Sequence, residues 1–460
     1  MKELIRPKDL TAGRPLPVLL SYSLPMFAGM FFQQAYNLAD SWIAGNHIGS
    51  LSLGAVGTCY PVTVLYIAVA SGLGIGTSIY CSQQFGSGGH QNVKDAVSTA
   101  LLCFIPCSVF LMLLGLFACP HILTWLSVPE EALLPTRQYL FIYTAGLPFL
   151  FLYNISTGVL NGLGNSGTPL IFLIFSSFMN IILDLVLVLF IPLGISGLAL
   201  ATLLSQAASS LATLFAVKKL CRRLGGEEHS SFSLPILREI LRLAVPSIVQ
   251  HVFMSTGQLA LQNIINGYGV ITMTGYSIAF RINGLYVNSL MALSNALSGF
   301  IAQNKGAGKQ GRIRQGYRLC LILGGCFTSA VVFLMLADGP AVLSFFVSPD
   351  PDKTEIIDAG MGFVRIVVPF YFLVCLKIVT DGALRGIGRM NAFMMSSISD
   401  VMVRLLLGDL FSRHWGINGV WWIWPAAWAV GTAVCCVSYR RADGNKAAYK
   451  MSAKKPAEKP

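Results

Sequence analysis

The chain has 460 residues, of which 54% are hydrophobic and only 11% are charged, and its formal net charge at pH 7 is +12. A soluble domain carries roughly 25% charged residues, so this composition excludes a water-soluble globular protein. A positive net charge is also typical of nucleic-acid-binding proteins, but most basic residues here cluster at the two termini and in connections between apolar segments, so we expect no nucleic-acid partner.

Twelve apolar stretches follow one another along the chain, each close to the length of about 20 residues that a membrane-spanning helix needs. They lie at 16–41, 53–80, 95–118, 138–160, 168–190, 196–217, 243–266, 275–302, 317–337, 359–384, 392–411 and 417–438. The strands of a membrane β-barrel would instead alternate over about ten residues, and these runs do not alternate. The sequence therefore predicts an all-α membrane protein with twelve transmembrane helices.

The second six stretches repeat features of the first six at a nearly constant distance of 220 to 224 residues. Four features recur in the same order: Pro25 as Pro246, Gln83 and Gly86 as Gln303 and Gly306, Gly162 and Gly164 as Gly386 and Gly388, and Gly194 and Gly197 as Gly416 and Gly419. Because six spans return the chain to the side where it began, the repeats should be parallel. We predict an N-terminal lobe at 1–217, a cytoplasmic linker at 218–242, a C-terminal lobe at 243–438 and a basic cytoplasmic tail at 439–460.

The placement of the basic residues predicts the orientation in the membrane. Most of the 32 Lys and Arg residues lie at the N-terminus, in alternate connections, in the linker and in the tail. The opposite connections hold only Arg137, Lys353 and Arg413. The positive-inside rule then puts both termini in the cytoplasm, in a protein integral to the cell membrane.

Two acidic residues inside the apolar stretches have no basic residue within four positions, namely Asp40 and Asp184. A charge at mid-membrane costs about 2.5–3.5 kcal/mol, so each acid requires an explanation. Asn180 and Asp184 share a helix face at i, i+4. An unpartnered acid in an apolar setting takes up a proton or recruits a cation, and carboxylate, amide and hydroxyl oxygens suit a hard cation such as Na⁺. The alternative is that each acid binds backbone groups freed by a kinked helix.

The second half has a different pattern, because its acids have basic neighbours. Asp381 has Lys377 and Arg385 four residues to either side, and Asp400 has Arg404 four residues on. These spacings place opposite charges on one helix face, so we predict structural ion pairs. The sequence leaves open what role in transport Arg281, Arg365, Lys377, Asp381 and Arg404 have.

Prolines inside the apolar stretches predict helix kinks. Pro25 lacks an N–H and should loosen the first helix about one turn earlier, and Pro148, Pro246 and Pro369 should act in the same way. Pro25 lies in the same stretch as Asp40, where a kink would suit a moving gate. Packing geometry is an equally good explanation.

Other residue types have structural explanations. The eleven Cys residues are scattered through apolar stretches and are expected to be small buried hydrophobes. The tryptophans at 421, 422, 424 and 428 predict an aromatic belt at the membrane interface. There is no nucleotide-binding glycine motif with Lys, no Ser/His/Asp set and no HExxH motif, so the sequence indicates neither an enzyme nor a bound cofactor.

Taken together, residues 16–438 resemble the multidrug and toxic compound extrusion (MATE) family. The resemblance rests on Pro25 with Gln33, Asn37 and Asp40, on Leu53-Gly54-Ala55-Val56-Gly57, on Gln83-Gln84-Phe85-Gly86, on Gly162-Leu163-Gly164 and on the matching features of the second half. It implies, for the DinF-type branch, a cation-coupling site made of Asp40, Asn180, Asp184 and Thr202, with Na⁺ as a possible metal there. Asn154 and Tyr139 are further implied members. A NorM-type site would need an acid in the seventh helix, and 243–266 contains none.

The resemblance implies a secondary antiporter that exports amphipathic, cationic organic compounds in exchange for Na⁺ or H⁺ by alternating access. Its expected partners are these small molecules and membrane lipid, and we expect it to act as a monomer. The alternative within the same superfamily is a flippase for lipid-linked oligosaccharides. Such a flippase would line its cavity with basic groups for a pyrophosphate headgroup.

Overall fold

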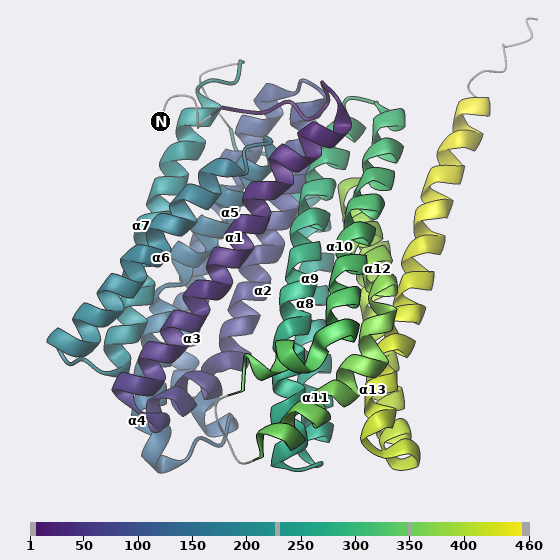
Figure 1. The fold of residues 1–460 in the computed structure, drawn as a ribbon. Helices are drawn as coiled ribbons and strands as arrows, with labels where there is room; N and C mark the ends of the chain where they lie inside the picture. Colours follow the sequence, from purple (N-terminus) through teal and green to yellow (C-terminus); the bar gives the residue numbers. More distant parts are fainter. Residues whose placement is uncertain (1–5, 226–230, 348–351, 453–460) are drawn as a thin grey trace, which may run out of the picture. The chain divides into compact units, whose positions relative to one another are not determined.

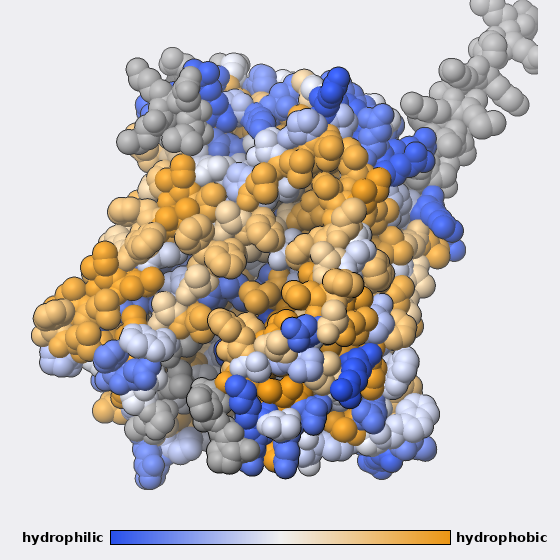
Figure 2. All heavy atoms as spheres, in the orientation of Figure 1, coloured by the Kyte–Doolittle hydropathy of each residue, from blue (hydrophilic) through white to orange (hydrophobic). Residues whose placement is uncertain are grey.

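The computed structural model describes residues 6–225, 231–347 and 352–452, and every regular element within these ranges is a helix (Figure 1). The predicted all-α class is therefore confirmed. Figure 2 shows hydrophobic residues over much of the middle of the visible face, with hydrophilic residues gathered toward its upper and lower ends. This banding is typical of a protein whose middle lies in hydrocarbon.

The described helices account for the twelve predicted spans. Nine helical segments are long and apolar enough to cross a membrane, and the pair α4 (Glu130–Ala145) and α5 (Leu147–Gly162), bent by 46°, makes a tenth. The 33-residue α8 (Leu234–Asn266) is less apolar than these but long enough to span. α13 (Met390–Ser452) contains the last two spans, because its backbone leaves the helical conformation at Gly416.

Two compact units organise the described residues. The first contains Met1–Val252 with Gly299–Ile313, and the second contains Phe253–Ser298 with Arg314–Pro460. The first unit holds α4, α5 and the following elements: α1 (Pro15–Ile43), η1 (Ala44–Ile48), α2 (Ser50–Gly86), α3 (His90–Trp125), α6 (Gly167–Leu185), η2 (Val186–Phe190) and α7 (Ile195–Cys221).

The second unit holds most of the remaining helices. These are α9 (Val270–Gly306), α10 (Gln310–Ser344), α11 (Lys353–Val367), η3 (Val368–Phe370), α12 (Tyr371–Gly386) and α13. Helices α8, α9 and α10 each contribute to both units. The packing units therefore interleave along the chain, and the lobe boundaries expected from the sequence stay a prediction.

The backbone repeats the duplication seen in the sequence. Gly194 and Gly416 have nearly the same positive φ, 57° and 58°, a conformation that residues with a Cβ rarely adopt. Pro148 lies at the start of α5, just after the α4–α5 bend, and its counterpart Pro369 lies in the short η3 between α11 and α12. The breaks predicted at these two prolines are therefore present in both repeats.

The other two prolines behave differently. α1 continues through Pro25 as one helix of 29 residues, and α8 continues through Pro246. A missing N–H removes one ladder hydrogen bond but does not end a helix that is held by its neighbours. A role for Pro25 as a gate stays a prediction.

A non-helical N-terminal segment, residues 6–14, is held by hydrogen bonds within the first unit. Gln303 bridges two distant parts of the chain, because its Oε1 accepts from the backbone N–H of Leu10 at 2.9 Å while its Nε2 donates to the carbonyl of Gly162 at 3.0 Å. Arg312 donates to three carbonyls of the segment, those of Leu10, Ala12 and Gly13. The segment thus joins the end of α5 to the α9–α10 connection.

The ends of α2 and α9 touch through paired glycines. A Cβ on Gly86 would overlap the backbone carbonyl of Gln303, and a Cβ on Gly306 would overlap that of Gln83. The two contacts are reciprocal: Gln83 and Gln303 each lie three positions before a glycine of the pair, and each contacts the glycine of the other helix. Only glycine permits such an approach.

Candidate functional site

A polar cluster in the first unit joins α1, α6 and α7 through the side chain of Asn180. Hydrogen bonding orients its amide so that Nδ2 donates to Asp40 Oδ1 at 2.9 Å and to Asp184 Oδ2 at 3.1 Å. The amide oxygen then accepts from the backbone N–H of Thr202 at 3.2 Å. The structure therefore brings together Asp40, Asn180, Asp184 and Thr202, the four residues that the family resemblance implied.

The two carboxyl groups of the cluster are also in direct contact. Asp40 and Asp184 are within hydrogen-bonding reach of each other, although ionised carboxylates can only accept. Asp184 is fully buried, and its Oδ1 has no hydrogen-bond donor among the described residues. A proton or a cation between the two carboxyl groups would supply the donor or the positive charge that this contact lacks.

Tyr36 is a member of the cluster that the sequence-based set of site residues omitted. Its hydroxyl is hydrogen-bonded to Asp40 and to Thr202. Tyr36 precedes Asp40 by four residues, so the i, i+4 spacing on α1 was the feature that could have identified it.

The two remaining predicted members have different positions. Tyr139 on α4 is close enough to interact electrostatically with both acids, and its ring stacks on that of Tyr143. Asn154 on α5 donates to the carbonyl of Leu150 in its own helix at 2.8 Å. Tyr139 is therefore placed beside the cluster, whereas no contact of Asn154 with the cluster is found among the described residues.

The local backbone is irregular just after each acid. α1 passes into the π-helical turn η1 four residues after Asp40, and α6 passes into the π-helical turn η2 two residues after Asp184. The two turns lie against each other. Single π-turns inside helices occur frequently at functional sites, because they displace neighbouring residues from the regular helix register.

The composition of the cluster suits a proton or an alkali cation. Its oxygen atoms come from two carboxyl groups, an amide and two hydroxyl groups, which are hard ligands. No ion pair joins Asp40 or Asp184 to a basic side chain within the described part of the chain. The unsatisfied Oδ1 of Asp184 fits the expectation of a bound cation at these residues.

The buried acids of the second unit form ion pairs with basic side chains of their own helices. Lys377 Nζ lies 2.9 Å from Asp381 Oδ2, and Arg404 Nε lies 2.6 Å from Asp400 Oδ1. The prediction of structural ion pairs is confirmed for both. Arg385 departs from it, since its guanidinium donates to Ser294 and Asn295 instead of Asp381. Arg281 and Arg365 are exposed.

The predicted aromatic belt is wrong for three of the four tryptophans. Trp421, Trp424 and Trp428 are at most 5% exposed, whereas Trp422 is 46% exposed. Trp421 stacks on Tyr276 with ring centroids 5.3 Å apart, and the guanidinium of Arg404 lies 4.0 Å from the ring centroid of Trp424. These rings fill the interior of the second unit, where they also shield the Asp400–Arg404 pair.

The fold and the site together define a helical membrane protein built from two repeats, with a buried polar cluster in its first half. The profile of the MatE family matches residues 25–186 and 246–409, one match in each repeat. The chain therefore belongs to the MatE family, whose members are transporters and not enzymes.

Named relatives agree with this assignment. The chain is 27% identical over 419 residues to the probable multidrug resistance protein YpnP of Bacillus subtilis, covering 90% of this chain and 92% of that protein. It is 26% identical over 415 residues to the FAD transporter of Shewanella oneidensis, covering 88% and 89%. A solved structure of a multidrug resistance MATE family transporter in an outward-facing conformation has a TM-score of 0.85 at 24% identity, covering 94% of this chain and 97% of that one, which supports the fold.

Proposed function

We propose that the chain is a secondary antiporter of the DinF type that exports amphipathic, cationic organic compounds in exchange for H⁺ or Na⁺. The observation that carries this proposal is the contact between Asp40 and Asp184, bridged by Asn180 and without a basic partner among the described residues. Two acceptors in contact need a proton or a cation between them. The second unit supplies such a cation from its own side chains, whereas no described basic side chain pairs with the two acids of the first unit.

The orientation of the Asn180 amide connects the cluster to the choice of ion. With the nitrogen toward the acids, the amide stabilises carboxyl groups that share a proton. A Na⁺ held by the same acids would instead need the amide oxygen, which a half-turn of the side chain provides. The cluster is therefore compatible with either ion, and each ion requires a different rotamer.

Exchange requires that ion and substrate favour different conformations of the protein. A ligand shifts a conformational equilibrium only by its difference in affinity for the two states. Binding of the ion to the cluster would stabilise one conformation, and binding of the exported compound would stabilise the other. Alternating access would then follow from movement of one repeat against the other.

The relatives bear on the substrate class. YpnP is named a probable multidrug resistance protein, which supports an organic drug-like substrate. Another relative is named an FAD transporter, so FAD, an anionic dinucleotide, is the alternative substrate to test. A flippase for lipid-linked oligosaccharides is not favoured by these relatives. Lys377 and Arg404 are basic groups of the kind that bind a pyrophosphate, but both are already paired with acids.

Transport by purified protein in proteoliposomes tests the proposal. A fluorescent organic cation and FAD would each be offered with a Na⁺ gradient alone and with a pH gradient alone. We expect the organic cation to move under one of the two gradients, and Asp40→Asn and Asp184→Asn to reduce that gradient-driven transport to the level of empty vesicles. Movement of FAD instead of the cation would replace the substrate class while keeping the coupling site.

Asp409→Asn is the matched control, because Asp409 is an exposed acid of α13 that pairs with Arg413 on the surface at 2.7 Å. This variant should transport at the rate of the unmodified protein. Gradient-driven transport that survives in both Asp40→Asn and Asp184→Asn would refute the coupling site.

A further inference from the structure

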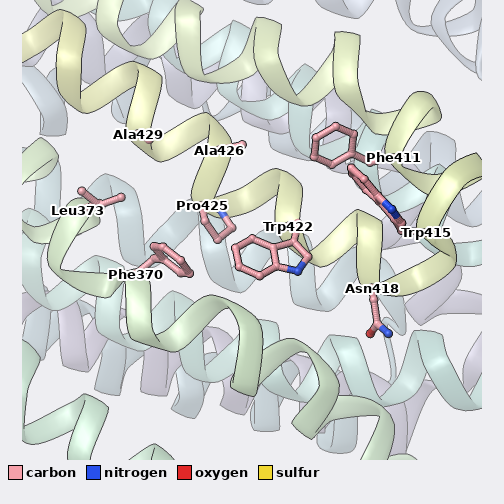
Figure 3. Close-up of a pocket in the computed structure, with 9 residues that line it drawn as sticks. All are labelled: Phe370, Leu373, Phe411, Trp415, Asn418, Trp422, Pro425, Ala426 and Ala429. Carbon is pink, nitrogen blue, oxygen red and sulfur yellow. The ribbon is translucent and has the colours of Figure 1, made fainter.

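A second feature lies outside the polar cluster, on the part of α13 on both sides of Gly416, from Phe411 to Ala429. A groove of about 760 Å³ runs along this helix, with Phe370 and Trp415 among its walls (Figure 3). Its size falls in the range of about 300–1,000 Å³ that is usual for small-molecule sites. Every residue discussed below belongs to the second unit.

The groove opens away from the aromatic interior of the unit. Trp422, Pro425 and Ala429 line it and recur at the spacing of one helix face. The buried Trp421, Trp424 and Trp428 lie on a different face, and Trp422 is 46% exposed. The small side chain at 429 and the ring at 425, beside the large indole at 422, produce the hollow (Figure 3).

The length of the groove matches one leaflet of a bilayer. Asn418 and Ala429 are eleven positions apart on a helix, which corresponds to about 16 Å at 1.5 Å per residue. The hydrocarbon core is about 30 Å thick, so one leaflet contributes about half of it. The charge distribution predicts that the connection around Arg413 faces the outside, so the groove would start at the outer surface and run inward.

The residues that line the groove suit an amphiphilic ligand. None of the described lining residues is charged, and aromatic, aliphatic and proline side chains form most of the surface. The polar amide of Asn418 and the indole of Trp415 both lie toward the same end (Figure 3). A polar end and a long apolar wall, at the depth of one leaflet, fit a lipid, and the described lining residues include no carboxylate to neutralise the charge of an organic cation.

We propose that this groove binds one acyl chain of a phospholipid from the outer leaflet, with the ester region of the lipid at Asn418 and Trp415. The bound lipid is then a component of the second unit that fills the space between α12 and α13. This inference does not depend on the nature of the exported compound or on the coupling ion.

A phosphatidylglycerol with a photoactivatable diazirine in its acyl chain tests the proposal in vesicles containing the full-length protein. After illumination, mass spectrometry would locate the labelled residues. We expect labelling concentrated within 411–429 and reduced about tenfold by Ala429→Phe, a loss that corresponds to about 1.4 kcal/mol of binding free energy. Val430→Phe adds the same ring at a neighbouring position, 41% exposed, that does not line the groove, and it should leave the labelling unchanged.

A second filling variant, Ala426→Leu, serves if Ala429→Phe does not fold. Equal labelling of Leu406, a 74% exposed residue elsewhere on α13, would mean that the lipid contact is non-specific and would overturn the proposal. Displacement of the label by a transported organic cation would assign the groove to substrate instead. Covalent dimers in place of lipid adducts would assign it to a second copy of the chain.

Discussion

Replacing Asp184 by Asn and replacing Asp400 by Asn should have opposite effects on the stability of the folded protein. Both residues are acids at most 2% exposed, and both substitutions keep the size of the side chain. Asp400 lies 2.6 Å from Arg404, whereas the partners of Asp184 among the described residues are neutral groups and a second acid. The difference in partners, and not the depth of burial, determines the expected sign.

For Asp400→Asn, the loss arises from the cation that remains. Arg404 is 7% exposed, so it cannot recover its hydration when the carboxylate is removed. Breaking a buried pair in this way costs about 3–5 kcal/mol. An asparagine can still accept one hydrogen bond from the guanidinium, and Trp424 still faces it, so we expect a value of about 3 kcal/mol.

For Asp184→Asn, no cation is left behind. The new amide can keep the hydrogen bond from Asn180 and can donate to Asp40, and the repulsion between two acids disappears. We expect the variant to be as stable as the unmodified protein or more stable by about 1 kcal/mol. Gains of this size are typical when a functional site loses an unfavourable polar group.

Thermal unfolding of the purified variants in one detergent, followed by a matched transport assay, measures both effects. Asp400→Asn should unfold at a lower temperature but retain gradient-driven transport per folded molecule, and Asp184→Asn should show the reverse pattern. The double variant Asp400→Leu with Arg404→Met should recover most of the lost stability, because it removes both charges. If Asp184→Asn proves as unstable as Asp400→Asn, the claim that Asp184 lacks a cationic partner is wrong.

Three further experiments examine other parts of the structure. Tyr36→Phe removes a hydroxyl that is hydrogen-bonded to Asp40 and Thr202. It should alter the ion dependence of transport by about tenfold, while the free energy of unfolding falls by no more than about 1.5 kcal/mol. An unchanged ion dependence would exclude Tyr36 from the cluster. Gly306→Ala should destabilise the protein by about 2 kcal/mol or more in thermal unfolding, because the added Cβ overlaps the carbonyl of Gln83. Gly308→Ala, at an open position with φ of 70°, should cost about 1 kcal/mol. Equal losses in the two variants would contradict the close packing of Gly306. A cysteine at Ser231 should react with a membrane-impermeant thiol reagent only after lysis and one at Thr354 in intact cells, and the opposite result would reverse the predicted topology.

The sequence predicted most of the fold because its main features are local. Span length can be read from apolar runs, and the duplication is visible in paired residues such as Gly194 and Gly416, whose matching positive φ angles the structure then reveals. The ion pairs of Asp381 and Asp400 followed from i, i+4 spacing alone. Patterns within one helix were therefore sufficient for these predictions.

Features that depend on contacts between helices were harder to predict. The face of α13 that carries Trp421 is buried by Tyr276 and Phe363, which are distant in sequence, so a composition rule assigned three tryptophans to the membrane interface incorrectly. Arg385 illustrates the same limit, because its partners Ser294 and Asn295 lie on α9. The meeting of Asp40 with Asp184 was implied only by the family resemblance, since no pattern within one helix joins α1 to α6.

The reciprocal contact of Gly86 with Gln303 and of Gly306 with Gln83 has a consequence for the origin of the chain. In a symmetric dimer, residue i of one subunit meets residue j of the other and the converse also holds, which is the arrangement of these two helix ends within one polypeptide. A single repeat would leave the carbonyl of Gly162 and the N–H of Leu10 without the amide of Gln303. The reciprocal contact is therefore the one that two separate copies of a single repeat would form with each other about a two-fold axis.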